Sequence, residues 1–255
     1  MLRVEYPLAR LRVVSVAAAC IIMSAVALAQ AAPAGIGASV VAAQDRTEAD
    51  RKTDARRQPE KFLDFTGVKP GMTVVDLMAG GGYTTELLAR AVGKTGKVYA
   101  QNSPTMSEKS ANAMAERLKK PEMAYVTQVL TPVEMPFLPD VAGKIDLVTF
   151  VLNYHDTTFL PIDRAKMNKA VFDGLKSGGT YVIVDHAAKA GDGATVGKSL
   201  HRIEEATVIA EVEAAGFKKE AEADFLRQPN DPKDQAFFDM KGEPTDQFVL
   251  RFKKP

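Results

Sequence analysis

From Lys69 onward the sequence alternates short β-branched runs with longer segments in which apolar residues recur every three or four positions. The short runs predict strands, and the amphipathic segments predict helices. Alternation of this kind predicts a parallel sheet with helices on both faces. We therefore expect an α/β fold, with a doubly wound, mostly parallel seven-stranded sheet covered by helices on both sides. The expected strands are residues 73–77, 97–101, 124–130, 145–152, 180–185, 217–225 and 247–252.

The stretch "VVDLMAGGGYTTELLAR" (residues 74–90) joins the first strand to the first helix through three glycines. Thr84 or Thr85 is the expected N-cap of that helix. In a doubly wound sheet ligands bind beyond the carboxyl ends of the strands, and a glycine turn there lets the backbone approach a ligand closely. A dinucleotide fingerprint would need glycine where Thr85 stands, and the G-K-[ST] ending of a P-loop is absent. An ordinary strand-to-helix turn is the structural alternative.

Residues 76–82 resemble the first motif, D-x-G-x-G-x-G, of the class I S-adenosylmethionine-dependent methyltransferases. Gly80 and Gly82 match its second and third glycines, and Met78 replaces the first. "GKIDLVTFVLNYHD" and "LKSGGTYVIVD" resemble the fourth and fifth strands of that superfamily, and the similarity runs over residues 69–255. The resemblance implies a Rossmann-like methyltransferase fold, S-adenosylmethionine as cofactor, and methyl transfer to a small-molecule or cell-envelope acceptor.

Several segments, among them "DARRQPEKFLDFTGVKPG", "NYHD" and "LHRIE", are similar to a narrower group of exported predicted methyltransferases of Gram-negative bacteria. This narrower resemblance implies no particular substrate.

The resemblance also implies which residues bind the cofactor. They are Asp76, Ala79, Gly80, Gly81, Gly82, Tyr83, Gln101, Asn102 and Asn153. Enzymes of this superfamily usually end the second strand with an acid that accepts hydrogen bonds from the ribose, whereas Gln101 or Asn102 stands there in this chain. A neutral amide cannot form the charge-assisted hydrogen bond that an acid forms with the ribose, and such a bond is roughly twice as strong as a neutral one. The alternative function is therefore a non-catalytic protein that binds S-adenosylmethionine or another nucleoside.

The predicted reaction site lies at the ends of the fourth and fifth strands, and its predicted catalytic residues are His155, Asp156 and His186. His155, oriented by Asp156, is a candidate general base because its unperturbed pKa lies near neutrality. In the alternative, these three residues and Asp185 bind zinc or manganese, which suit such a set better than magnesium does. We expect no metal ion, and a hydrogen-bonded structural role is open for each histidine. His201 is expected near the start of a long helix over residues 200–215.

The N-terminus differs from the rest of the chain. Residues 1–12 contain three arginines and one glutamate, residues 13–29 are almost wholly apolar, and residues 27–29 form an A-x-A pattern. This predicts a signal peptide at 1–29, followed by a linker at 30–45, an N-terminal helical segment at 46–68 and a methyltransferase-like domain at 69–255. An uncleaved membrane anchor is the alternative, although 17 residues are at the short limit for a span.

These features predict a periplasmic or secreted protein whose mature chain is not stably inserted in a membrane. Removal of the leader would take away Cys20, the only cysteine, which excludes a cysteine nucleophile. The net charge of +1 gives no sign of a nucleic-acid partner, so we expect a small-molecule substrate. The oligomeric state is not predicted. Asp54, Arg56 and Arg57 either cover the cofactor site or form a solvated helix face.

Overall fold

The computed structural model describes residues 1–3 and 35–255 and contains a seven-stranded sheet in the order β3-β2-β1-β4-β5-β7-β6. The strands are β1 (Thr73–Leu77), β2 (Lys97–Asn102), β3 (Val126–Leu130), β4 (Ile145–Val151), β5 (Leu175–His186), β6 (Lys218–Ala223) and β7 (Gln247–Lys253). The first five strands pair in parallel, and β7 lies antiparallel to both β5 and β6. The predicted doubly wound, mostly parallel sheet is confirmed.

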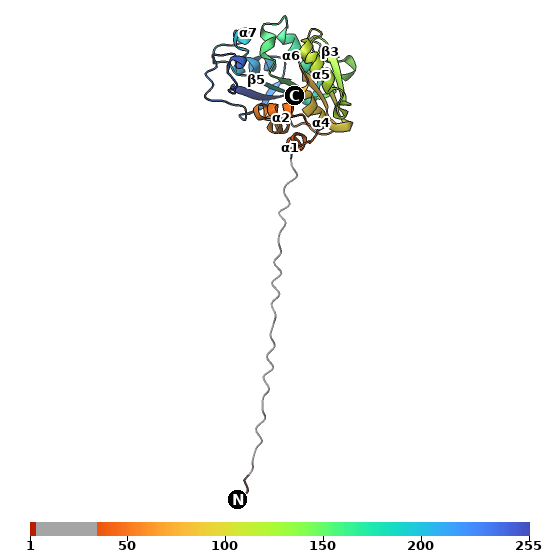
Figure 1. The fold of residues 1–255 in the computed structure, drawn as a ribbon, viewed down its shortest axis with the longest axis vertical. Coiled ribbons are helices and arrows are strands. Elements are labelled where there is room, and N and C mark those ends of the chain that lie inside the picture. The colour runs from red at the N-terminus through yellow and green to blue at the C-terminus, as the bar shows by residue number, and fades with distance from the viewer. Residues whose placement is uncertain (4–34) are drawn as a thin grey trace. The chain divides into compact units, whose positions relative to one another are not determined.

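Helices cover both faces of the sheet (Figure 1). They are α1 (Ile36–Val41), α2 (Glu48–Arg57), α3 (Pro59–Thr66), α4 (Tyr83–Val92), α5 (Glu108–Arg117), α6 (Arg164–Gly174), α7 (Gly197–Leu200) and α8 (Glu205–Ala214). Side chains of a strand alternate between the two faces. Thus Val74 of β1 packs with the buried residues of α3 and α4, whereas its neighbour Val75 packs with those of α6 and α8.

The chain order reverses at β1, which pairs with β2 on one side and with β4 on the other. In open α/β sheets the ligand crevice lies beyond the carboxyl ends of the strands at such a point. The polar residues that end β2 and β5, Asn102 and His186, therefore lie at the edge of the sheet where a ligand is expected.

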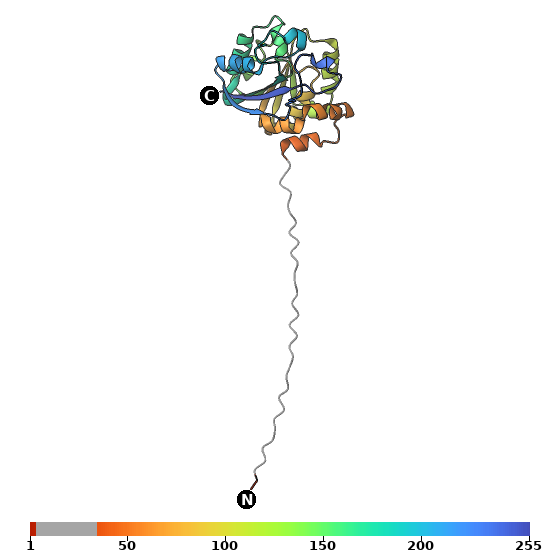
Figure 2. The ribbon, with the colours of Figure 1, turned by 90° about the vertical axis from the view of Figure 1, so that its left-hand side faces the viewer.

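Residues 36–41, within the segment for which a linker is expected, form α1 at the edge of the folded domain (Figure 2). Val40 is buried, and Gly37 donates its N–H to Asp64 of α3. A Cβ at Gly37 would lie 2.2 Å from a backbone oxygen of α3, so the small residue is what permits this contact. The small residues that suggested a linker thus let α1 pack closely. The predicted signal peptide and its alternative, an anchor, lie outside the described residues, and no described helix is long and apolar enough to span a membrane.

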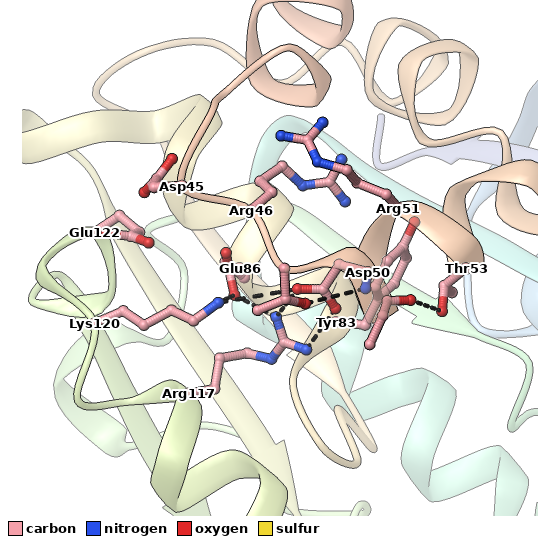
Figure 3. Close-up of polar contacts among 12 residues, drawn as sticks. Asp45, Arg46, Asp50, Arg51, Thr53, Tyr83, Glu86, Arg117, Lys120 and Glu122 are labelled. Carbon is pink, nitrogen blue, oxygen red and sulfur yellow. Dashed lines mark hydrogen bonds and ion pairs between the residues drawn. The ribbon is translucent and has the colours of Figure 1, made fainter.

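Helix α2 is polar along its length and is held in place by ion pairs rather than by an apolar face. Arg117 of α5 lies between Asp50 of α2 and Glu86 of α4, and its two terminal nitrogens lie 2.8 and 3.0 Å from the Asp50 oxygens (Figure 3). Lys120 adds a 2.8 Å bond to Glu86. At the other end of the helix, Asp54 accepts from the hydroxyl of Tyr83 at 2.7 Å. These bonds fix α2 over the turn that follows β1.

The helix predicted over residues 200–215 is wrong in its first part. Helix α7 ends at Leu200, His201 adopts a left-handed conformation (φ 51°), and α8 begins only at Glu205. The intervening backbone bonds to the end of β5 instead: Ile203 N–H donates to His186 O, and Ala188 N–H donates to Ile203 O. Tertiary hydrogen bonds therefore replace the helical ones, and they hold His201 beside the end of the sheet.

Candidate active site

The turn between β1 and α4 contains three residues with left-handed backbone: Met78 (φ 45°), Gly80 (φ 56°) and Gly82 (φ 83°). Gly82 is the N-cap of α4, so the predicted cap at Thr84 or Thr85 is wrong. Glycine adopts this conformation without steric cost. At Met78 a side chain is forced into it, which costs about 1–2 kcal/mol and accounts for glycine at this place in the resembled motif.

The two amides at the end of β2 brace this turn. Gln101 accepts from Met78 N–H at 3.0 Å and donates to Thr131 O at 2.7 Å. Asn102 accepts from Gly80 N–H at 2.8 Å and donates to Gly80 O at 3.3 Å. Both side chains are buried. The amides expected to meet the ribose are therefore already engaged with protein backbone.

Asp76, at the end of β1, is fully buried and bonds to two hydroxyls. Thr85 donates to one carboxylate oxygen at 2.7 Å, and Thr149 donates to the other at 2.8 Å. Burial raises the pKa of Asp76 to about 6, although both hydroxyls and Arg57 oppose the rise. Through these two bonds the carboxylate connects β1 to α4 and β4. Asp76 also lines the cavity between the glycine turn and α2.

Two cavities adjoin the glycine turn. One, of about 340 Å³, lies between the turn and α2, and the other, of about 550 Å³, lies between the turn, the end of β2 and residues 132–134. Met78, Gly80 and Asn153 line both of them. A Cβ at Gly80 would meet only Met78 O, at 4.0 Å, so the backbone here borders open space.

A third cavity, of about 550 Å³, is lined by His155, His186 and His201. It shares Asn153 and Arg57 with the cavity under α2, so Asn153 borders all three cavities. The Asn153 amide donates to Met78 O at 3.2 Å and to Val151 O at 2.9 Å. Its carbonyl oxygen has no hydrogen-bond partner among the described residues and is available to a ligand at this junction.

Arg57, the last residue of α2, lies between the α2 cavity and the histidine cavity and lines both. It is partly buried and forms no ion pair with any carboxylate in residues 35–255. Burial and the neighbouring charge of Arg56 lower the pKa of Arg57 to about 10. A buried cation without a partner is costly, so this position is prepared for an anionic group. Of the 54–57 segment, Arg57 lines the cavity beside the glycine turn, and a role of this segment in covering a cofactor stays a prediction.

His155 lies just past β4 and is oriented by Asp185 of β5. Its Nδ1 and backbone N–H both lie 2.7 Å from the Asp185 carboxylate, which is completely buried. Its Nε2 faces Asp156 at 3.2 Å and His201 Nδ1 at 3.3 Å. Burial alone would lower the pKa of His155, but Asp185 and Asp156 outweigh it and raise the pKa to about 10. The orienting carboxylate is thus Asp185, while Asp156 lies on the cavity side of the ring.

His186 is also at the cavity, but it is neutral. Burial lowers its pKa to about 3, against the effect of Asp185. Its Nδ1 lies 2.6 Å from the hydroxyl of Thr245, and its ring stacks on Phe237 at 5.0 Å between centroids. His186 therefore forms part of an aromatic wall.

The structure gathers the predicted residues into two groups. Asp76, Ala79, Gly80, Gly81, Tyr83, Gln101, Asn102 and Asn153 line the two cavities at the turn, and His155, Asp156 and His186 line the third. Gly82 lines neither cavity at the turn, because α5 covers it: a Cβ there would lie 3.0 Å from Met114.

Sequence reasoning missed Phe237, Phe238 and Thr245, which line the histidine cavity. Their loop is fixed by a buried ion pair between Arg202 and Asp231, with a closest N···O distance of 2.7 Å. Two adjacent phenylalanines in the otherwise polar stretch "PKDQAFFDMKG" were the available signal.

Comparison with known protein families decides what this constellation belongs to. The model of the ubiE/COQ5 methyltransferase family matches residues 54–193, which is more than half of the chain and runs from α2 past the end of β5. The chain belongs to the ubiE/COQ5 methyltransferase family. The predicted membership of the S-adenosylmethionine-dependent methyltransferases is thereby confirmed, and membership of the narrower exported group stays a prediction.

A curated relative of this family is the ubiquinone/menaquinone biosynthesis C-methyltransferase UbiE of Hydrogenovibrio crunogenus. It is 27% identical over 124 residues, which are 48% of this chain and 45% of the relative. The aligned region thus spans less than half of that enzyme.

Solved structures show the same fold at low sequence identity. A methyltransferase from Aquifex aeolicus aligns over 80% of this chain and 96% of its own, with a TM-score of 0.58 and 21% identity. Geranyl diphosphate C-methyltransferase from Streptomyces coelicolor, solved with Mg²⁺, geranyl diphosphate and S-adenosylhomocysteine, aligns over 85% of this chain and 88% of its own, with a TM-score of 0.59 and 14% identity.

Proposed function

We propose that this protein is an S-adenosylmethionine-dependent methyltransferase that acts on a small-molecule or cell-envelope acceptor. The observation that carries the proposal is the meeting of three cavities at Asn153. Two of them flank the glycine turn, and the third contains the histidines. A cofactor along the turn and an acceptor among the histidines would then meet at one residue.

The residues at the turn fit the cofactor. Gly80 leaves open space on the ligand side. The two adjoining cavities are large enough for one to hold the amino-acid part of S-adenosylmethionine and the other its nucleoside part. Arg57 would bind the carboxylate of the amino-acid part, and the free carbonyl oxygen of Asn153 would accept a hydrogen bond from its amino group. When bound, the cofactor supplies an electrophilic methyl group on a sulfonium sulfur.

The chain's own contribution to the transfer is positioning. Methyl transfer is a displacement in which the acceptor atom must lie in line with the methyl group, and holding that geometry supplies much of the rate enhancement. We propose that His155 and Asp156 hold the acceptor group at the mouth of the histidine cavity. Asp185 fixes the ring of His155 so that Nε2 faces this cavity. His186 and Phe237 would form the wall against which the acceptor packs.

One observation favours the alternative of a non-catalytic binding protein. The amides of Gln101 and Asn102 are engaged with the backbone of the turn, and no acid is present at the end of β2. Cofactor affinity is therefore expected to be modest, because the ribose would lose a charge-assisted bond.

Release of S-adenosylhomocysteine discriminates between the two functions. The chain is incubated with S-adenosylmethionine and an extract of the envelope and small molecules of a Gram-negative bacterium. We expect release to fall at least about 100-fold in His155→Gln while the dissociation constant of S-adenosylmethionine changes little. Binding without release from this extract would favour the non-catalytic alternative.

We further propose that the protein acts in the periplasm or outside the cell, on the basis of the residues 1–29 pattern alone. N-terminal sequencing of the protein recovered from the periplasm tests this. A start near residue 30 is expected, and recovery of the unprocessed chain from the cytoplasm would contradict it.

A further inference from the structure

Three donor atoms converge at the mouth of the histidine cavity: Nε2 of His155, Oδ1 of Asp156 and Nδ1 of His201. The distance between the two nitrogens is 3.3 Å, and the Asp156 oxygen lies 3.2 Å from His155 and 3.5 Å from His201. We propose that these three residues form a binding site for a transition-metal dication of the zinc type. This inference goes beyond the proposed function, because metal binding requires neither S-adenosylmethionine nor a methyl acceptor. With zinc bound, His155 and Asp156 would hold an acceptor through the ion rather than by direct contact.

The spacing of the donors fits a tetrahedral ion. Zinc lies about 2.0–2.1 Å from nitrogen and carboxylate oxygen, so two ligands of a tetrahedral site are about 3.3–3.4 Å apart. The three observed separations, 3.2, 3.3 and 3.5 Å, bracket that value. An ion placed about 2.1 Å from all three atoms would lie just outside their plane, with its fourth position open.

A second, independent observation supports the site on the other side of the His155 ring. Metal-binding histidines commonly donate their remaining N–H to a carboxylate, which fixes the ring orientation and presents the other nitrogen to the metal, whose binding displaces the proton there. Nδ1 of His155 lies 2.7 Å from Asp185, which is completely buried and also accepts the backbone N–H groups of His155 and His186. Asp185 thus lies at Nδ1 of His155, on the side of the ring opposite the proposed metal, and is not itself a ligand.

The position of His201 is fixed by neighbouring aromatic rings and by its backbone. Its ring makes edge contacts with Phe159, Phe237 and Phe238, at 5.8, 6.1 and 5.2 Å between centroids. Its left-handed backbone is uncommon for a residue other than glycine, and the bonds between Ile203 and the end of β5 hold it there. The aromatic surroundings also limit the access of water to the site.

The ligand set differs from the one considered as an alternative in the sequence. His186 is not a member of the set, because only His155, Asp156 and His201 have ligand atoms that all lie within 4.8 Å of one another among the described residues, and Asp185 is excluded as described. Two imidazoles and one carboxylate suit zinc and similar transition metals, whereas magnesium demands oxygen ligands. The three side chains all border the cavity of about 550 Å³, so the open position would face whatever occupies it. The ligand class that fits is an oxygen donor, such as a phenol, an enol or a carboxylate.

Calorimetric titration of the metal-stripped chain with ZnCl₂ in the absence of S-adenosylmethionine tests the site. We expect one zinc ion per chain, with a dissociation constant that rises at least about tenfold in both Asp156→Asn and His201→Ala. Both side chains are partly exposed, so neither change should prevent folding. His186→Gln is the matched control, because it removes an imidazole from the same cavity and should leave zinc affinity unchanged.

Absorption of the Co²⁺-loaded chain gives an independent readout, since Co²⁺ bound tetrahedrally by these ligands absorbs visible light and aqueous Co²⁺ absorbs it only weakly. The proposal is overturned if stoichiometric zinc binding is missing, or if the affinity is the same in the wild type and in both ligand variants. A loss in His186→Gln as large as in His201→Ala would also overturn the assigned ligand set. Because the readout is metal affinity alone, a chain that binds zinc but not S-adenosylmethionine would refute the proposed function and leave this inference standing.

Discussion

Replacement of Arg117 by methionine tests whether ion pairs hold α2 over the cavity beside the glycine turn. Arg117 pairs with Asp50 and Glu86, whose side chains are only 7% and 2% exposed (Figure 3). Methionine keeps the aliphatic stem and removes the charge. Breaking a buried pair by removing one partner typically costs about 3–5 kcal/mol, because the other charge is left buried.

The expected loss in the free energy of unfolding lies at the lower end of that range, and most of it comes from leaving Asp50 without its main partner. Glu86 would keep Lys120 at 2.8 Å and Arg90 at 2.8 Å, whereas Asp50 would keep only Lys120 at 3.9 Å. We therefore expect Arg117→Met to lower the free energy of unfolding by about 3 kcal/mol at pH 7. The matched control is Lys119→Met, whose partner Glu116 is 72% exposed and which should change stability by less than about 0.5 kcal/mol.

The pH dependence of this difference gives the prediction a second check. Burial tends to raise the pKa values of Asp50 and Glu86, but Arg117 and neighbouring cations outweigh it and lower both. A carboxylate with a lowered folded pKa stabilises the protein above its ordinary pKa near 4, and this contribution is lost as the pH falls through the folded value. The gap between wild type and Arg117→Met should therefore shrink below about pH 4.

Urea unfolding followed by circular dichroism at pH 7 and at acid pH measures both quantities. A loss below about 1 kcal/mol, or one equal to that of Lys119→Met, would refute the claim that this network holds α2. A gap that stays constant on acidification would refute its electrostatic origin.

Two further predictions concern the buried charges at the same site. Asp76→Asn should raise the free energy of unfolding by about 2–3 kcal/mol at pH 8 and leave it unchanged near pH 4. The reason is that the wild type, with a folded pKa of about 6 at Asp76, loses stability as the pH rises through that value. Urea midpoints that are the same in wild type and variant at both pH values would contradict the cost assigned to burying this carboxylate. Arg57→Met should leave the free energy of unfolding in urea unchanged or raise it, because it removes a partly buried cation without a partner among the described residues. It should also weaken S-adenosylmethionine binding at least about tenfold by calorimetry, with Arg56→Met as the control. Equal binding by wild type and variant would remove Arg57 from the proposed cofactor site.

Local patterns were sufficient for the strands and for the position of the glycine turn, but not for the N-cap of α4. The β-branched runs around Val74 and Leu147 are buried along almost their whole length, as strands covered on both faces must be. The resemblance around Gly80 implied the Rossmann-like fold that the sheet confirms. The helix over residues 200–215 was misread because apolar periodicity continues through the break. What ends α7 is a set of bonds to the end of β5, which no local pattern records.

The partners within the site are distant in sequence, which is why they could not be assigned. Asp185 rather than Asp156 orients His155, across 30 residues, and His201 lies beside His155 across 46 residues. Arg57 reaches the site because Arg117, Tyr83 and Arg46, all outside α2, hold that helix in place. Residue type alone also predicted a histidine that titrates near neutrality, whereas two carboxylates raise the pKa of His155 and burial lowers that of His186.

Calorimetric titration of the chain with S-adenosylmethionine and S-adenosylhomocysteine tests the central claim most directly, with Gly80→Ala and Gly143→Ala as a matched pair. Both glycines have left-handed backbone and room for a Cβ, so both changes should cost a similar 1–2 kcal/mol or so of stability, but only Gly80 borders the two cavities at the turn. Micromolar binding that survives Gly143→Ala and is lost in Gly80→Ala is the predicted result. No binding to either compound at millimolar concentration by the folded wild type would contradict the account.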